Sequence, residues 1–293
     1  MSALFALMLP AAQGALLYVT DPDANTLWLV NEAGVKSAVL GAPGGLNAPT
    51  GVAAGPGGVA YVADSMNDRV LKYDPMGGIW SVFATGFGVS SIAVDLLGNV
   101  FAASNVEGQV RKYDSSGAMI TSVGADAPTA IAVNAAGDVF VALTNGAFGL
   151  EVRTFANSLL GGSTFFAASN DPYGLAFSDG DLYGTNLGTG EVEKFDPLGP
   201  AWNSFTSGSS FPIGLAFAPD GTLYVASSTE IQRFSASGTF IDSFGGVFTS
   251  VSGLAFSTVP EPGTYAMIGI GLIGLSLVGR KRRSAAARVV RRD

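Results

Sequence analysis

The sequence of 293 residues contains no cysteine and no histidine. Without cysteine the fold relies on packing alone, because no disulfide can staple it. Without histidine, histidine-based general acid–base chemistry, Ser-His and Cys-His nucleophiles and histidine-ligated zinc or iron are excluded. Any hydrolytic chemistry would need a carboxylate base beside a metal ion.

Charged residues are scarce and unevenly placed. Seven of the fifteen basic residues follow Gly279. The preceding body, counted without Glu261, holds 8 basic and 21 acidic residues, which is a net charge of −13. Such a body repels nucleic acid phosphates, so a nucleic acid partner is not expected.

A short apolar segment recurs along the chain at a nearly constant spacing. Its alanines follow one another after 40, 39, 44, 40 and 39 residues, at Ala53, Ala93, Ala132, Ala176, Ala216 and Ala255. A period near forty residues is typical of a propeller or a solenoid. Between two such segments lie three further strand-like runs joined by tight turns, which is the content of one propeller blade.

The repeat predicts an all-β, six-bladed propeller. Five units are complete, over residues 49–84, 90–123, 128–168, 172–206 and 212–245. The sixth is split, because 251–257 has an inner strand alone and 16–40 has outer strands alone. Pairing of these two ends would close the ring and remove an exposed sheet edge.

Turns and strand starts follow the same period. Asp, Asn or Ser opens many of the turns and Gly stands at the fourth position, as in Asp74–Gly77 and Asp114–Gly117. The glycines are predicted to supply positive φ rather than a phosphate-binding loop, because no helical pattern follows them. Small residues before the repeated alanines are expected where inner strands crowd around an axis.

Two stretches carry a family resemblance. The segments 51–70 (GVAAGPGGVAYVADSMNDRV) and 213–234 (IGLAFAPDGTLYVASSTEIQRF) resemble NHL repeats, which fold as propeller blades. The resemblance covers residues 16–257 and implies the fold. It leaves function open, since propellers of this kind bind proteins, sugars or RNA and some are enzymes.

The N-terminal residues 1–14 (MSALFALMLPAAQG) are apolar and end in small residues, as a secretory signal peptide does, although no basic residue precedes the apolar run. We expect export and cleavage near Gly14. The domain boundaries predicted from composition are 1–14, a propeller over 15–258, a sorting segment over 259–283 and a basic tail over 284–293.

The C-terminal segment has three parts. Pro260, Glu261 and Pro262 come first, then an uncharged run over 264–279, then the basic cluster Arg280, Lys281, Arg282 and Arg283. As a helix the run would be about 24 Å long, near the lower limit for a membrane span. This order resembles the PEP-CTERM sorting signal. The resemblance implies processing by an exosortase, membrane contact during processing, and delivery to the cell surface or extracellular matrix.

Polar loops are expected to gather on one face of the propeller. We expect their acidic residues to be turn caps, with no cofactor. The alternative is a Ca²⁺ site that would use Asp64, Asn67, Asp126 and Asp171, since hard oxygen ligands suit this ion. These alternatives lead to two functions. The favoured one is a non-catalytic scaffold for a protein or polysaccharide at the cell surface. The other is a Ca²⁺-dependent lactonase of the gluconolactonase kind, a family that shares this shape.

Overall fold

The computed structural model describes residues 15–31, 34–145, 149–159, 163–168, 172–196, 201–209 and 211–257. Residues Ala15–Thr258 make one compact unit. The expected signal peptide and the expected sorting helix over 264–279 lie outside the described residues. Within the described ranges, no helix is long and apolar enough to cross a membrane.

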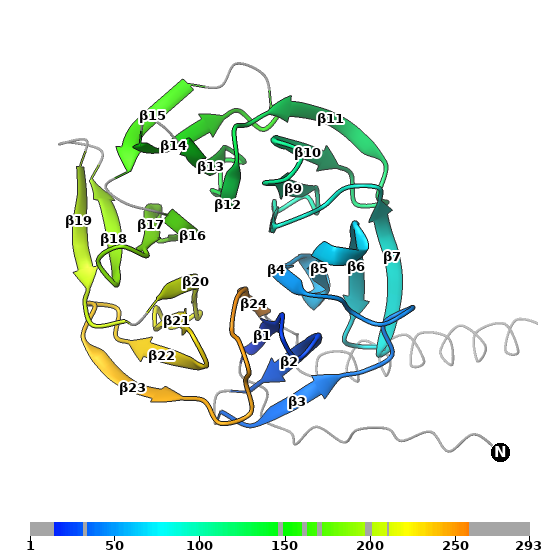
Figure 1. The fold of residues 1–293 in the computed structure, drawn as a ribbon, viewed down its shortest axis with the longest axis horizontal. Coiled ribbons are helices and arrows are strands. Elements are labelled where there is room, and N and C mark those ends of the chain that lie inside the picture. Colours follow the sequence, from blue (N-terminus) through cyan, green and yellow to red (C-terminus); the bar gives the residue numbers. More distant parts are fainter. Residues whose placement is uncertain are drawn as a thin grey trace, which may run out of the picture. The chain divides into compact units, whose positions relative to one another are not determined.

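Six four-stranded antiparallel sheets surround a central axis (Figure 1). Five of them are formed by four consecutive strands each. The first two are β4 (Pro49–Ala54), β5 (Ala60–Asp64), β6 (Arg69–Asp74) and β7 (Ile79–Thr85), then β8 (Ser91–Val94), β9 (Val100–Ser104), β10 (Gln109–Tyr113) and β11 (Met119–Gly124). The next is β12 (Pro128–Val133), β13 (Val139–Asn145), β14 (Gly149–Phe155) and β15 (Ser163–Ala168). The last two are β16 (Pro172–Ser178), β17 (Asp181–Asn186), β18 (Glu191–Asp196) and β19 (Ala201–Thr206), then β20 (Pro212–Phe217), β21 (Leu223–Ser227), β22 (Glu230–Phe234) and β23 (Phe240–Phe244).

The remaining blade joins the two ends of the described chain. Strand β24 (Leu254–Ser257) pairs with β1 (Leu16–Asp21), which is followed by β2 (Thr26–Val30) and β3 (Lys36–Val39). The pairing is antiparallel, with Leu17 opposite Phe256 and Tyr18 opposite Ala255. The predicted six-bladed propeller, closed by strand pairing between its ends, is confirmed. Two short 3₁₀ turns, η1 (Pro56–Gly58) and η2 (Ser65–Asn67), supply the helical segments of the described part.

The hydrophobic core lies between the blades. Each of six buried clusters joins two neighbouring sheets, for example Tyr18 and Leu27 with Val52 and Tyr73. Together the clusters bury most of the aromatic side chains on the second and third strands of the blades. This arrangement follows from the repeat, because one blade alone cannot cover its own two apolar faces.

The inner strands approach one another closely, as the small residues before the repeated alanines predict. A Cβ atom at Gly214 would lie 2.1 Å from the carbonyl oxygen of Ser252, and one at Gly174 would lie 2.5 Å from that of Ile213. Both oxygens belong to the backbone, so they cannot move aside as a flexible side chain can. A larger residue at these positions would force neighbouring blades apart.

The turns behave largely as predicted. Asp114 accepts hydrogen bonds from the backbone N–H groups of Ser116 and Ala118, at 2.9 and 3.0 Å, and Gly117 has φ +91°. The turn after β6 differs from the prediction. There the positive φ of 62° is found at Gly78 and not at Gly77, the fourth residue.

Candidate functional site

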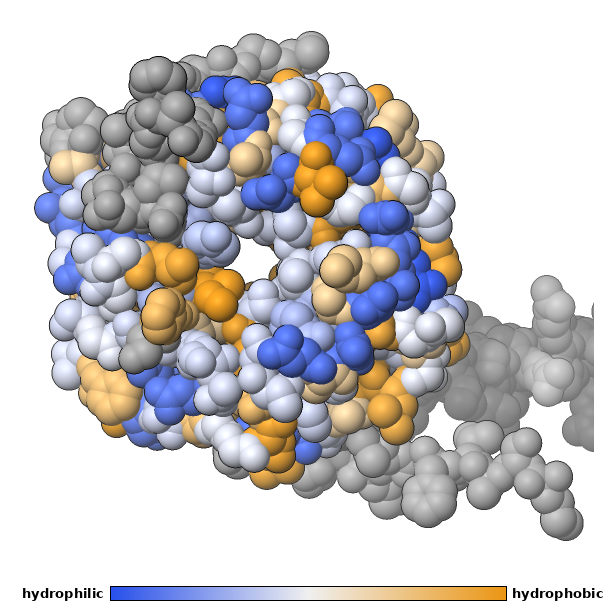
Figure 2. All heavy atoms as spheres, viewed as in Figure 1, coloured by the Kyte–Doolittle hydropathy of each residue, from blue (hydrophilic) through white to orange (hydrophobic). Residues whose placement is uncertain are grey.

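A cavity of about 370 Å³ lies at the propeller axis. It is lined by the first residues of the inner strands, together with Pro22 from the β1–β2 loop and Asn105 from the β9–β10 loop. It therefore opens on the face that carries the loops after the second strands. Figure 2 shows an opening at the centre of the ring. We call this cavity the axial mouth.

One repeat position supplies much of its lining. The residue after the proline, or after the valine that replaces it, lines the axial mouth in every blade. These residues are Thr50, Ser90, Thr129, Tyr173, Ile213 and Ser252. The prolines are the first residues of β4, β12, β16 and β20, as their lack of a ladder donor requires.

The threonines among them also link neighbouring blades. The Thr50 hydroxyl donates to the carbonyl oxygen of Ser90 at 2.8 Å, and the Thr129 hydroxyl donates to that of Pro172 at 2.7 Å. Thr20, near the end of β1 in the closing blade, donates in the same way to the carbonyl oxygen of Thr50, at 2.7 Å. These bonds hold adjacent inner strands together at the rim, so this part of the axial mouth is preformed.

The opposite side of the rim is more apolar. Tyr173 is 42% exposed, and Phe211, just before β20, is 66% exposed. Figure 2 shows apolar side chains beside the central opening, over β20. The axial mouth thus joins a hydroxyl-bearing side to a side with an aromatic ring and an aliphatic residue, Ile213.

Charged groups are absent from the described residues that line the axial mouth. Its polar side chains are hydroxyls and the Asn105 amide. A Ca²⁺ ion in a protein is held largely by carboxylate and carbonyl oxygens. The described lining therefore does not fit a calcium-dependent centre.

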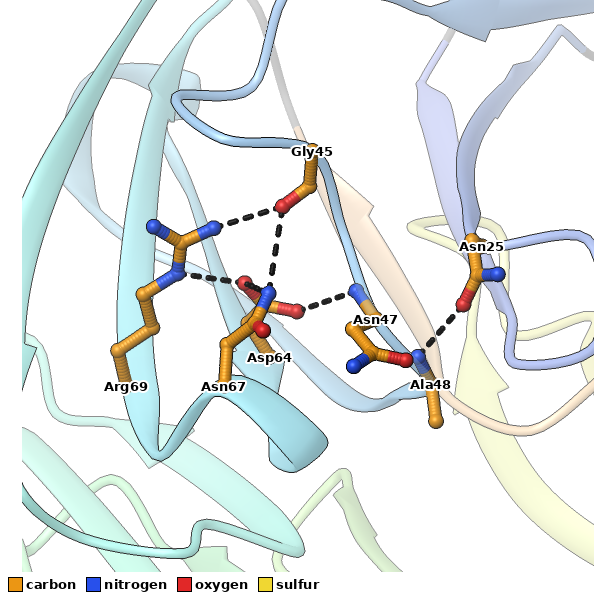
Figure 3. A network of polar contacts seen from close by, with 7 residues as sticks. All are labelled: Asn25, Gly45, Asn47, Ala48, Asp64, Asn67 and Arg69. Carbon is orange, nitrogen blue, oxygen red and sulfur yellow. Dashed lines mark hydrogen bonds and ion pairs between the residues drawn. The ribbon is translucent and has the colours of Figure 1, made fainter.

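The buried carboxylate of Asp64 lies at the end of β5 and is fully engaged with N–H donors (Figure 3). One oxygen accepts from the backbone N–H of Asn47 at 2.7 Å, and the other accepts from the Asn67 amide at 2.9 Å. Arg69 Nε donates to the same second oxygen at 2.6 Å and forms an ion pair with it. This network fastens the link between β3 and β4 to the β5–β6 loop.

Asp21 stands at the same place in the closing blade, at the end of β1, and is also fully buried. Its carboxylate accepts from the backbone N–H groups of Thr249 and Ser250, at 2.8 and 3.0 Å, and from the Thr249 hydroxyl at 2.7 Å. The Ala24 N–H adds a bond of 3.1 Å within the loop. Asp21 therefore ties the end of β1 to the segment that enters β24.

Other blades have uncharged polar residues at this position. Ser104, Asn186 and Ser227 end the second strands of their blades, and all three are buried. Ser104 accepts from the Glu107 N–H at 3.0 Å, and Asn186 accepts from the Thr189 N–H at 3.1 Å. A polar residue ending each apolar second strand is visible in the sequence, and it could have identified these loop caps.

The outcome differs among the four residues of the alternative metal prediction. Asp64 and Asn67 are hydrogen-bonded to each other, Asp126 is exposed, and Asp171 lies outside the described residues. In the part of the chain that the structure describes, no group of three or more acidic side chains is placed to hold a metal. The donors around Asp64 favour the turn-cap interpretation for that residue.

Shifted pKa values mark structural contacts away from the axial mouth. Partial burial acts to raise the pKa of Asp95, but hydrogen bonds from Asn99, Asn157 and Leu97 outweigh it, so the pKa is lowered. On the outer strands, hydrogen bonding to Arg233 lowers the pKa of Asp242. Burial raises the pKa of Tyr18, whose hydroxyl donates to the carbonyl oxygen of Gly58 at 2.8 Å.

The sorting residues predicted from the sequence, Pro260–Pro262 and Arg280–Arg283, lie outside the described residues. Their assignment comes from comparison with known proteins. Residues 258–283 match the PEP-CTERM protein-sorting motif. No curated protein matches the chain.

Solved structures share the propeller fold at low sequence identity. One is the crystal structure of a nidogen/laminin complex, with a TM-score of 0.74 and 16% identity over 84% of this chain and 99% of the other. Another is a gluconolactonase from Xanthomonas campestris, with a TM-score of 0.64 and 16% identity over 84% of this chain and 91% of the other. At this identity the likeness establishes the fold alone. The chain is thus a six-bladed propeller followed by a PEP-CTERM sorting motif, which implies processing by an exosortase and sorting to the cell surface.

Proposed function

We propose that this protein is a non-catalytic binding scaffold of the cell surface, and that its axial mouth takes an uncharged polar ligand. The lining of the axial mouth carries the proposal. Hydroxyls stand on one side, Tyr173 and Ile213 stand on the other, and the described lining has no charged group.

A neutral sugar unit of a polysaccharide fits this chemistry. A sugar ring has hydroxyls that hydrogen-bond to Ser and Thr, and an apolar face that packs on an aromatic ring. A cavity of about 370 Å³ is at the small end of the range for ligand pockets, which suits one or two such units. An acidic polymer is disfavoured, because the body around the axial mouth has a net charge of −13.

The alternative function is hydrolysis of a lactone on the same propeller. The similarity to the gluconolactonase structure supports only the shared fold. Hydrolysis without histidine needs a carboxylate base and, in the calcium-dependent version, a carboxylate-bound metal. The described lining offers neither group, so binding without catalysis is the better-supported function.

The test is calorimetric titration of the full chain with neutral and acidic oligosaccharides. We expect a neutral oligosaccharide to bind and Tyr173→Ala to weaken that binding about tenfold, because the exposed ring is the aromatic platform of the axial mouth. Met76→Ala is the matched control, since Met76 is 56% exposed in the turn after β6, away from the axial mouth. Calcium-dependent turnover of gluconolactone that EDTA abolishes would contradict the proposal.

A further inference from the structure

The course of β24 shows on which face the chain leaves the propeller. Strand β24 begins at Leu254, which lines the axial mouth, and ends at Ser257. The Ser257 hydroxyl donates to the carbonyl oxygen of Gly58, at 3.2 Å, in the turn between β4 and β5. The chain therefore leaves the propeller on the face opposite the axial mouth. We call this the exit face.

The sequence after Ser257 limits how far this exit can lie from the uncharged run of the sorting motif. Six residues, 258–263, separate Ser257 from the uncharged run at 264–279. Fully extended, six residues span about 20 Å. While that run is held in a bilayer, the exit cannot move far from the lipid surface.

The exit face also carries an unusual apolar turn. Leu96 and Leu97, between β8 and β9, are 78% and 81% exposed. The neighbouring Gly98 lies against the β4–β5 turn, because a Cβ atom there would be 3.8 Å from Pro56. Since Ser257 contacts Gly58 of that same β4–β5 turn, the leucines are near the chain exit.

The turn that presents these leucines is well supported. The Asp95 carboxylate accepts from the backbone N–H groups of Leu97 and Asn99, at 3.0 and 2.8 Å. The corresponding turn after β12 has Ala135 and Ala136 in place of the leucines, and the one after β20 has Pro219 and Asp220. Two exposed leucines are therefore not required by the turn itself.

We propose that the exit face lies on the lipid surface while the sorting tail is uncleaved, with Leu96 and Leu97 in contact with lipid. The axial mouth then points away from the membrane and is open to ligand before processing. The contact is apolar, because the acidic body would not be attracted to anionic lipid. The inference rests on the sorting tail and is independent of which ligand the axial mouth binds.

The absence of cysteine makes a clean test feasible. Leu97→Cys and Val106→Cys place one label at either end of β9, in positions that are 81% and 89% exposed. Each full-length variant carries a donor fluorophore and is reconstituted into phosphatidylcholine vesicles with an acceptor on the lipid headgroups. We expect energy transfer from position 97 to be at least twice that from position 106. Equal transfer, or greater transfer from 106, would overturn the orientation.

A polarity-sensitive fluorophore at the same two positions tests lipid contact itself. We expect a blue shift on vesicle binding at 97 and none at 106. No shift at 97, or failure of the full chain to float with the vesicles, would overturn the proposal. Thermal melts confirm that both variants fold. A failure of Tyr173→Ala to affect sugar binding would refute the ligand proposal and leave this one standing.

Discussion

Asp21 and Asp64 occupy the same place in two neighbouring blades, yet they fasten different parts of the chain. Asp64 holds the link 17 residues before it and an arginine five residues after it. Asp21 holds Thr249 and Ser250, which are 228 and 229 residues away. One repeat position therefore serves as a local loop cap in one blade and as the fastening of the whole ring in the other.

Replacing Asp21 should have the largest effect on stability. Asp21→Ala removes four hydrogen bonds to a buried carboxylate, and we expect the free energy of unfolding to fall by about 3 kcal/mol. Denaturant unfolding measures the loss. Hydrogen exchange should show faster opening of β24 and β1. Unchanged exchange in those two strands would mean that Asp21 does not fasten the ring.

Replacing Asp64 should cost less. Asp64→Ala should lower the free energy of unfolding by about 2 kcal/mol, because the freed Arg69 and Asn67 are near enough to water to be rehydrated. Faster hydrogen exchange is expected in the β3–β4 link and the β5–β6 loop, with β24 unaffected. An Arg69→Ala variant is the control, since it removes the bonds of Arg69 to Asp64 and to Gly45 and leaves the carboxylate bond to Asn47. A loss as large as that of Asp21→Ala would remove the distinction between the two aspartates.

The smallest effect is expected at Asp95, on the exit face, and it should depend on pH. A lowered pKa in the folded state means that the ionised carboxylate stabilises the fold at pH values above the ordinary value of 3.8. This contribution is lost as the pH falls through the folded-state pKa. We expect Asp95→Asn to be less stable than the natural protein by about 1 kcal/mol at pH 7, a figure already reduced for solvent screening.

The pH dependence of that difference is the informative measurement. Unfolding of both proteins between pH 7 and pH 2 should show the gap narrowing below about pH 4. A gap that stays constant would show that the carboxylate charge makes no contribution. The comparison isolates Asp95, because all other acidic groups are common to the two proteins.

The sequence was most informative where the repeat imposes the same demand in every blade. The alanine spacing predicted the ring and its closure, and the small residues at Gly174 and Gly214 predicted the crowding at the axis. The contact of Asp21 with Thr249 was not predicted, although it repeats the contact of Asp64 with Asn47: Thr249 stands two residues before Val251, as Asn47 stands two residues before Pro49. The polar residue that recurs at the ends of β1 and β5 predicts a loop cap, but it does not predict which segment that cap holds.

The axial mouth was predicted only as a face and not as a set of residues. Thr50, Thr129 and Tyr173 follow prolines that are visible in the sequence, so their shared position could have been noted. Their roles differ because a hydroxyl can bond to the next blade, whereas an aromatic side chain at the same place is left partly exposed. The exit-face leucines also escaped notice, since exposure at a turn is a property of the folded chain.

Closure through β24 has a consequence for the order of events in the cell. Strand β24 is among the last parts of the propeller to be synthesised and exported. The ring therefore stays open until nearly the whole propeller has crossed the membrane. Joining segments this far apart in sequence is slow, because the intervening chain must first be ordered. The sorting motif begins at residue 258, directly after β24. Closure of the propeller and synthesis of its processing signal therefore coincide, and a nascent chain cut short before β24 would have neither.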